Sequence, residues 1–444
     1  MAALRARLER LEQRAADQDF ALRHAQDRLT DVERVVDRLD AAAARADRIA
    51  ATTALVGVLP PSTERVSVVM PTRNRAHVLP RALASVRAQS LQTWELIVID
   101  DGSTDATPEI LAEAAREDPR IRVMPGDFAN SSTARNVALD IATAPYIAYL
   151  DDDNLMGPQW LRAVVWAFER HPEAQVGYGA RVMDAPGHGP PWIEFETWSR
   201  RHMQFRCITD QNVLAHRAGA PEMRYDEALD LGSDWAAALR ATETSDPVMI
   251  PVVATIYDAS GTDRLSERPE AYLRWLQVQR AELRRRPLRV LGVDLASPPL
   301  GDEATAAAVR QWRDAGARVG WCAEGRPLRD LGVPSHDDLE PAIDAIDADV
   351  VALHARRVVA SQLDRLIRAE SPFVVVAPEG TDLDDLAIVR DHELCAGVWG
   401  PAGPGRDELL DALDLIRVRK LGLPDAEDLL AQAVELEQLD PRPA

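Results

Sequence analysis

The sequence predicts an α/β protein with a long N-terminal helix, and three observations lead to this fold class. At 444 residues the chain is long enough for about three structural units. Apolar positions step by three and four through residues 4–50, whereas short β-branched runs alternate with helical stretches beyond residue 64. Hydrophobic residues make up 46% of the chain, which is ordinary for a globular protein and excludes wholesale disorder.

The first predicted unit is a helix over residues 1–55 with a narrow apolar stripe. The stripe comprises Leu4, Leu8, Leu11, Ala15, Leu22, Ala25, Leu29, Val32, Val36, Leu39, Ala43 and Ala46. This 3-4 spacing, interrupted once by Gln18, is the pattern of a coiled-coil seam, so we expect residues 4–50 to join copies of the chain into a homo-oligomer. The alternative is a single helix, roughly 70 Å long, packed on its own globular domain. The pattern leaves dimer and trimer open.

The second unit is expected over residues 64–285, after a proline-containing linker at residues 60–63. Strands are predicted at residues 65–71, 95–99 and 146–150, with helices at residues 77–89 and 106–115 between them. Alternating strands and helices are typical of a layered α/β domain. A basic R-R-R-P segment at residues 284–287 marks its end.

The third unit, residues 287–444, repeats the alternation. Strands are predicted at residues 288–294, 317–323, 349–354, 372–377 and 395–400, with helices including residues 302–315, 361–370 and an acidic one at 426–439. Near-continuous apolar strands predict a parallel sheet covered on both faces, as in a Rossmann-like domain. The segment after its first strand, L-A-S-P-P-L-G-D, has neither a G-x-G-x-x-G fingerprint nor a phosphate-loop lysine. His354, after the third strand, is either a ligand contact or, as is commoner for a lone histidine, structural.

Charge and cysteine content exclude several classes of protein. The 51 basic and 72 acidic residues give a net charge of −21, which argues against nucleic acid as a partner. Three cysteines without a close pair form neither a disulfide framework nor a thiolate zinc site, and suit a reducing cytoplasm. No apolar run approaches the roughly 20 residues that span a bilayer. We therefore expect a cytoplasmic protein without a transmembrane segment, and leave peripheral membrane contact open.

Acidic residues follow two of the predicted strands directly. Asp151, Asp152 and Asp153 come after residues 146–150, and Asp100 and Asp101 come after residues 95–99. Adjacent carboxylates repel one another, and a bound Mg²⁺ or Mn²⁺ relieves that repulsion because both ions prefer oxygen ligands. The alternative for the triplet is a solvated acidic turn.

The first predicted strand brings cations to the same edge, because it ends in Pro71, Thr72, Arg73, Asn74 and Arg75. Ligands of open α/β sheets bind at the carboxyl ends of the strands. A metal ion and arginines neutralise phosphate, while a carboxylate accepts hydrogen bonds from a base or ribose. This edge therefore predicts a nucleoside diphosphate site.

Four segments together resemble family 2 glycosyltransferases of the GT-A fold over about residues 64–270. They are V-S-V-V-M-P-T-R-N-R, E-L-I-V-I-D-D-G-S-T-D, S-T-A-R-N-V-A-L and Y-I-A-Y-L-D-D-D-N, in this order and spacing. The resemblance implies an inverting transferase that uses a nucleotide-diphosphate sugar and Mn²⁺ or Mg²⁺. Donors with uracil are the default expectation for this family.

The resemblance also implies roles for individual residues. Nucleotide-sugar binding falls to Pro71, Thr72, Arg73, Arg75, Asp100, Asp101, Arg135, Asn136, Asp151 and Asp152. Asp100 and Asp101 would hold the base and ribose, and Arg135 and Asn136 would close over the nucleotide. Asp151 and Asp153 form the D-x-D pair at the metal, with Asp153 as the direct ligand and Asp151 nearer the ribose.

Asp234 corresponds to the catalytic base of the family. Taken alone, it would be read as an acid favoured by the dipole at a helix N-terminus. Two features depart from the family pattern: Ser233 stands where relatives often carry an acid, and residues 256–266 lack a histidine. Asp258, Asp263 or water is then the candidate for any third metal ligand.

Two further stretches have open interpretations. The aromatic residues Trp192, Phe195, Trp198 and Phe205 form either an acceptor surface, because sugar faces stack on aromatic rings, or part of the core. The third unit is interpreted as an accessory domain for acceptor binding or assembly, or as a degenerate second glycosyltransferase half.

The sequence thus favours a metal-dependent inverting glycosyltransferase that moves a sugar to a glycan or protein hydroxyl. One alternative is a sugar nucleotidyltransferase, for which a glycine-rich basic loop would be expected and P-T-R-N-R-A-H is not glycine-rich. The other is a catalytically inactive scaffold organised by the coiled coil.

Overall fold

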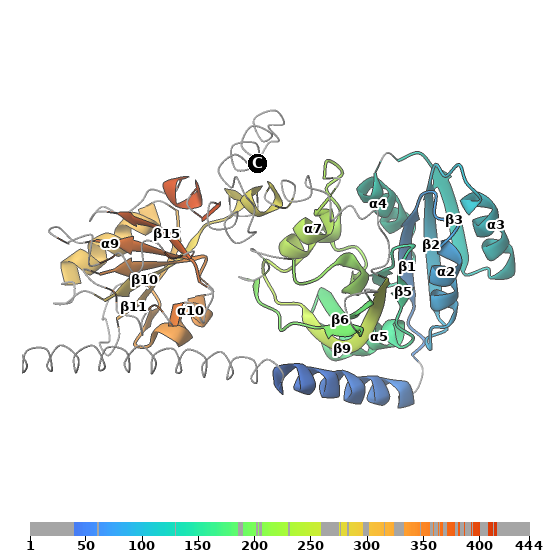
Figure 1. Ribbon diagram of the computed structural model, residues 1–444, viewed down its shortest axis with the longest axis horizontal. Coiled ribbons are helices and arrows are strands. Elements are labelled where there is room, and N and C mark those ends of the chain that lie inside the picture. Colours follow the sequence, from blue (N-terminus) through green and yellow to red (C-terminus); the bar gives the residue numbers. More distant parts are fainter. Residues whose placement is uncertain are drawn as a thin grey trace, which may run out of the picture.

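The computed structural model describes residues 40–59 and 62–258, except 129, 185–189, 201–202, 204–206 and 230, and parts of residues 275–414. In that last range the gaps are 276, 282–283, 296–301, 315, 324–332, 347, 356–357, 359–362, 364, 367–370, 378–380, 382–385, 387–391, 393, 400–406 and 412. The helix predicted at residues 426–439 lies outside the described residues, as does most of the one at 361–370. Figure 1 shows two lobes, each built around one sheet.

The strands are β1 Val66–Thr72, β2 Trp94–Asp101, β3 Ile121–Gly126, β4 Tyr146–Tyr149, β5 Leu155–Met156, β6 Val176–Asp184, β7 Trp192–Glu194, β8 Leu214–Arg217, β9 Val248–Asp258, β10 Arg289–Asp294, β11 Arg318–Cys322, β12 Ser335–His336, β13 Val350–His354, β14 Phe373–Val376 and β15 Cys395–Trp399. The helices are α2 Leu79–Arg87, α3 Thr107–Glu117, α4 Ser131–Ile141, α5 Trp160–Arg170, α7 Ser233–Ala241, α9 Asp302–Asp314 and α10 Leu339–Ile346, with short 3-10 turns η1 Gln211–Val213 and η2 Pro221–Met223.

The first sheet has the strand order β3-β2-β1-β4-β8-β6-β9-β5, with β7 paired to β6. Strands β1 to β4 are parallel to one another, and β8 adds antiparallel to β4. Every residue of β2 is buried, as expected for a strand covered on both faces. Because β1, β2 and β4 are parallel, the loops that follow them meet at one edge of the sheet, where the predicted site residues lie.

A helix over residues 40–58 leads into this sheet (Figure 1). Its Ile49 and Val56 are buried in the same core as the first sheet, and Arg162 of α5 donates a hydrogen bond to the Leu59 carbonyl. The end of the predicted N-terminal helix therefore rests on the first lobe. Residues 1–39 lie outside the described residues, so the coiled coil over residues 4–50 stays a prediction.

The second sheet is entirely parallel, with the order β12-β11-β10-β13-β14-β15. Counted along the chain this is 3-2-1-4-5-6, the order of a Rossmann fold. All five strands predicted for this region are present, and the short β12 is a sixth. The α/β fold class is thus confirmed for both sheets.

The described core residues form two hydrophobic clusters, one from Ile49 to Val278 and the other from Leu288 to Leu413. A buried ion pair, Arg280 to Asp414 at 2.5 Å, connects the segment between the sheets to the second lobe.

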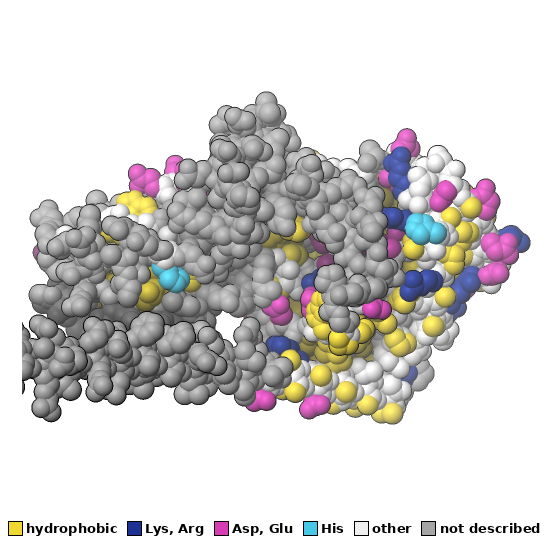
Figure 2. Space-filling model, viewed as in Figure 1, with side chains coloured by type: hydrophobic (Ala, Val, Ile, Leu, Met, Phe, Trp, Pro, Cys, Tyr) yellow, Lys and Arg dark blue, Asp and Glu magenta, His cyan; other side chains and the backbone are white. Residues whose placement is uncertain are grey.

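Acidic and basic side chains are interspersed on the right of the face shown in Figure 2. The domain boundaries near residues 285 and 287 remain a prediction. Among the described helices, none combines the length and apolar character needed to cross a membrane.

Candidate functional site

The loops after β1 and β2 bring a pair of aspartates to the carboxyl edge of the first sheet. Thr72 and Asp100 are paired in register, and both are buried, as is Asp101. The Asp101 carboxylate accepts a hydrogen bond from the Phe128 backbone N–H, beyond β3. Arg73 lies 3.8 Å from the same carboxylate. Asp101 is therefore held in place beside an arginine, and Asp100 lies next to it at the same edge of the sheet.

The same two loops are tied to each other by backbone and side-chain hydrogen bonds. The Asn74 side chain accepts from the Thr104 N–H at 2.7 Å, and the Asn74 N–H donates to the Ser103 hydroxyl at 2.9 Å. The Arg75 N–H donates to the Thr107 hydroxyl at 2.9 Å. Asn74 has a positive φ of 54°, which asparagine tolerates better than most residues. These bonds make one wall of the site from two separate loops.

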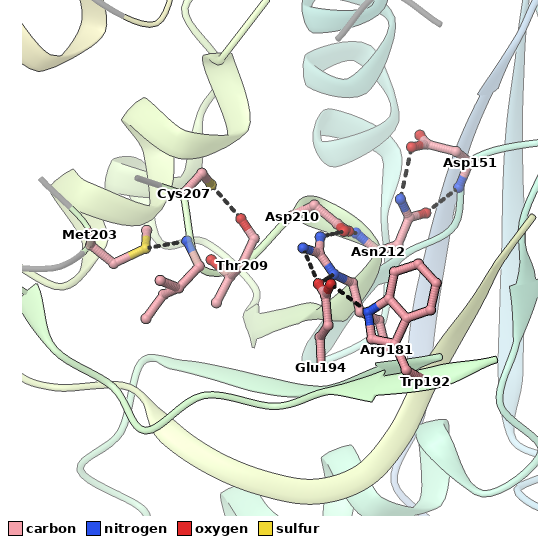
Figure 3. Close-up of polar contacts among 10 residues, drawn as sticks. Asp151, Arg181, Trp192, Glu194, Met203, Cys207, Thr209, Asp210 and Asn212 are labelled. Atoms are coloured by element: carbon pink, nitrogen blue, oxygen red, sulfur yellow. Dashed lines mark hydrogen bonds and ion pairs between the residues drawn. The ribbon is translucent and has the colours of Figure 1, made fainter. Parts of the chain in front are cut away.

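Asp151 is held by hydrogen bonds from several side chains, and Figure 3 shows those that it forms with Asn212. Arg135, from α4, approaches one of its oxygens at 3.1 Å, and Gln211 donates to that same oxygen. Asn212 donates to the other oxygen at 2.8 Å and accepts from the Asp151 N–H at 2.6 Å. Helix α4 begins at the Asn130 cap, whose side chain accepts from a backbone N–H of the first turn. Asp151 thus has a fixed orientation set by three side chains.

Asp152 and Asp153 differ sharply in environment. Burial raises the pKa of Asp152 to about 7, and the neighbouring charges of Asp153 and Asp151 raise it further. Arg75 lies 3.5 Å from Asp152 and opposes this shift. Asp153 is exposed at the turn. Of the triplet, Asp153 is therefore the carboxylate presented to solvent.

A protein metal centre of three or more acidic, histidine or cysteine side chains is not found among the described residues. Asp258 and Asp263, the two candidates for a third metal ligand, do not add such a group among the described residues. Asp258 ends β9 in register with Asp184. Asp263 lies outside the described residues.

Asp234 lies in the first turn of α7 and is partly buried. Burial raises its pKa, and the charges of Asp210 and Asp151 raise it further, whereas Arg135 lowers it. The residues whose charges act on Asp234 are thus those that surround the Asp151 carboxylate. Asp234 thus lies near Asp151 in the fold, although it comes more than eighty residues after Asp151 in the sequence.

Ser233, the departure from the family pattern, is buried rather than exposed to the site. Its hydroxyl lies 2.8 Å from the hydroxyl of Ser132 in α4. Ser132 also donates to the Leu229 carbonyl at 3.0 Å. A serine here joins α7 to α4, and a buried acid in this position would face the cost of desolvation.

Two of the predicted nucleotide-binding residues are engaged in the fold itself. The Asn136 side chain donates to the Tyr225 carbonyl and accepts from the Tyr225 N–H, both at 2.9 Å, and contacts Glu227 at 2.8 Å. Pro71 lies within β1 and pairs with Ile99 of β2. A nucleotide contact by either residue stays a prediction.

A cluster that the sequence did not indicate lies behind Asp151 (Figure 3). Arg181 of β6 contacts Asp210 and Glu194, both at 2.6 Å. Asp210 caps the turn that carries Asn212, and the Trp192 indole donates to Glu194 at 2.9 Å. The run Asp-Gln-Asn at residues 210–212 was the available signal, since three polar residues directly precede the apolar residues Val213 and Leu214, where β8 begins.

The aromatic stretch divides between the two interpretations. Phe195 and Trp198 pack on the Tyr178 ring, with centroids 5.7 and 6.0 Å away, so they belong to the core. Trp192 is 39% exposed, and Phe205 lies outside the described residues. Among the described residues of this stretch, Trp192 is therefore the aromatic side chain still available for an acceptor surface.

The strand order of the first sheet and its polar edge define an α/β domain with the candidate site at the carboxyl ends of parallel strands. Residues 67–230 match the family model "Glycosyl transferase family 2", and the chain carries a family 2 glycosyltransferase domain over this segment. The predicted resemblance is thereby confirmed.

The chain is similar to several named proteins. "Succinoglycan biosynthesis protein ExoO" of Rhizobium meliloti (strain 1021) is 36% identical over 181 residues, which cover 36% of this chain and 50% of that protein. "UDP-Glc:alpha-D-GlcNAc-diphosphoundecaprenol beta-1,3-glucosyltransferase WfgD" of Escherichia coli is 37% identical over 80 residues, or 18% of this chain and 31% of that protein. The crystal structure of S. aureus TarS 1-349 in complex with UDP-GlcNAc has 19% identity and a TM-score of 0.43, covering 49% of this chain and 65% of that one. The chain spans between 23% and 50% of the length of the curated relatives it matches.

Proposed function

We propose that this protein is a metal-dependent, inverting glycosyltransferase that moves a sugar from a nucleotide diphosphate to a hydroxyl of a glycan or protein. The observation that carries the proposal is the convergence of Arg135, Gln211 and Asn212 on Asp151, with Asp234 under the influence of the same charges. These residues lie in or beside the segment that matches the glycosyltransferase family.

An unpaired buried atom at the site supports a polar ligand. The Arg135 Nε is buried and makes no hydrogen bond within the described part of the chain. Such atoms are rare in folded proteins because leaving one unpaired costs about 1–3 kcal/mol. We infer that the nucleotide-diphosphate donor supplies its partner, with Asp100 and Asp101 at the base and ribose and Arg73 near the phosphates.

The donor set also suits Mn²⁺ or Mg²⁺, because both prefer carboxylate oxygens and retain positions for phosphate oxygens. Asp153 would hold the ion, since it is the exposed carboxylate of the triplet. The oxygens of Asp151 already accept three hydrogen bonds, so its part is to orient the donor side of the site. When bound, the ion supplies positive charge that stabilises the departing diphosphate.

Asp234 is the base of the proposed reaction. Its raised pKa makes the carboxylate a better proton acceptor for an acceptor hydroxyl than a fully solvated aspartate would be. The hydroxyl oxygen forms its bond to the anomeric carbon as the bond to the diphosphate breaks, and the proton passes to Asp234. One direct displacement inverts the configuration at that carbon.

The base assignment is tested with Asp234→Asn. This variant should lower kcat by about 10²–10⁴-fold while leaving donor affinity nearly unchanged, because the lost group acts on the acceptor. Turnover is measured by release of nucleoside diphosphate, and affinity by calorimetric titration. Glu222→Gln removes an exposed acid from the nearby η2 turn and should leave both quantities unchanged. Full activity of Asp234→Asn would show that the base is misassigned.

Calorimetric titration with nucleotides also distinguishes the glycosyltransferase from a sugar nucleotidyltransferase and from an inactive scaffold. UDP that binds more tightly with Mn²⁺ than without it supports the transferase, and a UDP donor is favoured by the name of the E. coli relative. Preference for nucleoside triphosphates would favour a sugar nucleotidyltransferase. Absence of nucleotide binding would favour the scaffold.

A further inference from the structure

The second sheet contains a topological switch point that the proposed reaction does not use. β10 and β13 are neighbours at its centre, and the chain continues from them towards opposite edges of the sheet. Their last residues, Asp294 and His354, are paired in register, and both are buried. In open α/β sheets, ligands bind outside the carboxyl ends of the strands at this point.

A glycine in β10 allows a third strand to reach the same place. A Cβ at Gly292 would lie 2.3 Å from the ring of Trp321 in β11, so only glycine leaves room for the indole at this position. The indole crosses β10 and contacts His354 of β13, with ring centroids 5.2 Å apart. Because side chains alternate along a strand, Gly292 and Asp294 face the same side of the sheet. Three strands therefore build one local cluster.

The cluster holds polar atoms without partners. His354 Nε2 and Trp321 Nε1 are buried and make no hydrogen bond within the described residues. The same holds for the hydroxyl of Thr305, near the start of α9, which follows β10 at this edge. Burial lowers the pKa of His354 to about 4, so its imidazole is neutral near pH 7 and offers one donor and one acceptor.

His216 in the first sheet shows that a buried histidine of this protein need not have a nitrogen without a hydrogen bond. Burial lowers its pKa to about 4 as well. Yet its Nε2 lies 2.7 Å from the Tyr149 hydroxyl, and its Nδ1 lies 2.7 Å from the Arg217 carbonyl. His216 is therefore a satisfied core residue, whereas His354 has an unpaired nitrogen at a switch point.

We propose that the carboxyl edge of β10 and β13 is a second ligand site, in which Asp294 and His354 bind a neutral carbohydrate. A hydroxyl both donates and accepts, and a carboxylate can accept several hydrogen bonds, so a sugar can pair with the free His354 nitrogen and also bond to the Asp294 carboxylate. The Asp294 charge opposes a phosphate, and the sequence after β10 lacks a phosphate-binding glycine loop. The inference rests on the proposed function in one respect: the glycan acceptor of a glycosyltransferase is the carbohydrate that this site would hold.

The test uses full-length protein labelled with ¹⁵N at histidine, without nucleotide. Maltotetraose, cellotetraose and N-acetylchitotetraose are titrated separately at millimolar concentration. At least one should shift the His354 nitrogen resonances, while those of His216 stay in place. Failure of all three to shift His354 would overturn the proposal. A shift of His354 by UDP in place of the sugars would also overturn it, because the site would then be a nucleotide site.

Variants separate this site from the proposed catalytic one. His354→Leu should weaken binding of the responding tetrasaccharide at least tenfold, as measured by calorimetry, and leave UDP affinity unchanged. His354→Gln, which retains a donor and an acceptor, should lose less and serves if the leucine variant does not fold. Asp153→Asn should leave oligosaccharide affinity unchanged. Tetrasaccharide binding that is unaffected by both His354 variants contradicts the inference, whereas an unmodified chain that binds the tetrasaccharide but transfers no sugar contradicts only the proposed function.

Discussion

His216 shows how burial and hydrogen bonding fix the protonation of a single residue. The Tyr149 hydroxyl donates to its Nε2, so the proton resides on Nδ1 and is donated to the Arg217 carbonyl. The Tyr149 ring also packs edge-on against Tyr225, with centroids 5.7 Å apart. Tyr225 in turn lies under the guanidinium of Arg135, at 5.5 Å. A neutral His216 thus supports the aromatic residues beneath the arginine that contacts Asp151.

This arrangement predicts acid sensitivity. The pKa of His216 is about 4 in the fold against 6.5 for the free side chain, so the unfolded chain takes up a proton first as pH falls. The free energy of unfolding should therefore decrease as pH falls below 6.5, by about 2 kcal/mol at pH 5 from this residue. Urea denaturation at pH 7 and pH 5 measures the loss, and His216→Gln should lose about 2 kcal/mol less than the unmodified chain. Equal losses would mean that His216 is already charged in the fold.

At the scale of elements, the site depends on a connection between β6, β7 and η1. Arg181 in β6 lies between Glu194 of β7 and Asp210, which caps η1. Since η1 carries Gln211 and Asn212, this ion-pair cluster holds in place the turn that orients Asp151.

Arg181→Leu tests this connection. Both acids are only partly exposed, so removal of the arginine should destabilise the chain by about 2 kcal/mol, between the values for exposed and buried pairs. The KM for the nucleotide-sugar donor should also rise, because Asp151 loses its fixed turn. Arg224→Leu is the matched control: its pair with Asp140 is exposed and should contribute less than about 1 kcal/mol. Equal effects of the two substitutions, in urea denaturation and donor kinetics, would exclude a special role for Arg181.

The elements recognised from the sequence are those whose pattern is local. β1, β2 and β4 are apolar runs that end directly in polar site residues, so both the strands and the clustering of their carboxyl ends were predictable. β6 and β9 were not, because Gly177 and Gly179 interrupt the first and Pro251 lies inside the second. Their pairing depends on contacts between segments about 70 residues apart, which no local pattern encodes. Gln211 and Asn212 were missed for the same reason: β8 pairs with β4 from about 70 residues further along.

At the scale of the whole molecule, the helix at residues 40–58 connects the predicted coiled coil to the first lobe. Ala43 and Ala46 of the predicted seam are exposed, whereas Ile49 and Val56, one heptad apart, are buried in the core. The stripe that would pair with another chain therefore continues onto the protein's own domain. A helix anchored at one end in this way can hold a partner helix without covering the carboxyl edge of the first sheet, since it lies along α5 and β9 (Figure 1).

Deletion of residues 1–39 separates these two roles. The shortened chain keeps Ile49 and Val56, so its first lobe should retain its stability and its donor binding. It should lose most of the apolar seam and become monomeric, because fewer than two heptads of seam cannot sustain a coiled coil in water. Light scattering after size-exclusion chromatography gives the mass, with Leu22→Glu and Leu29→Glu in the full chain as the matched point variants. A shortened chain that keeps the mass of the full-length oligomer would place the contact between copies outside the N-terminal helix.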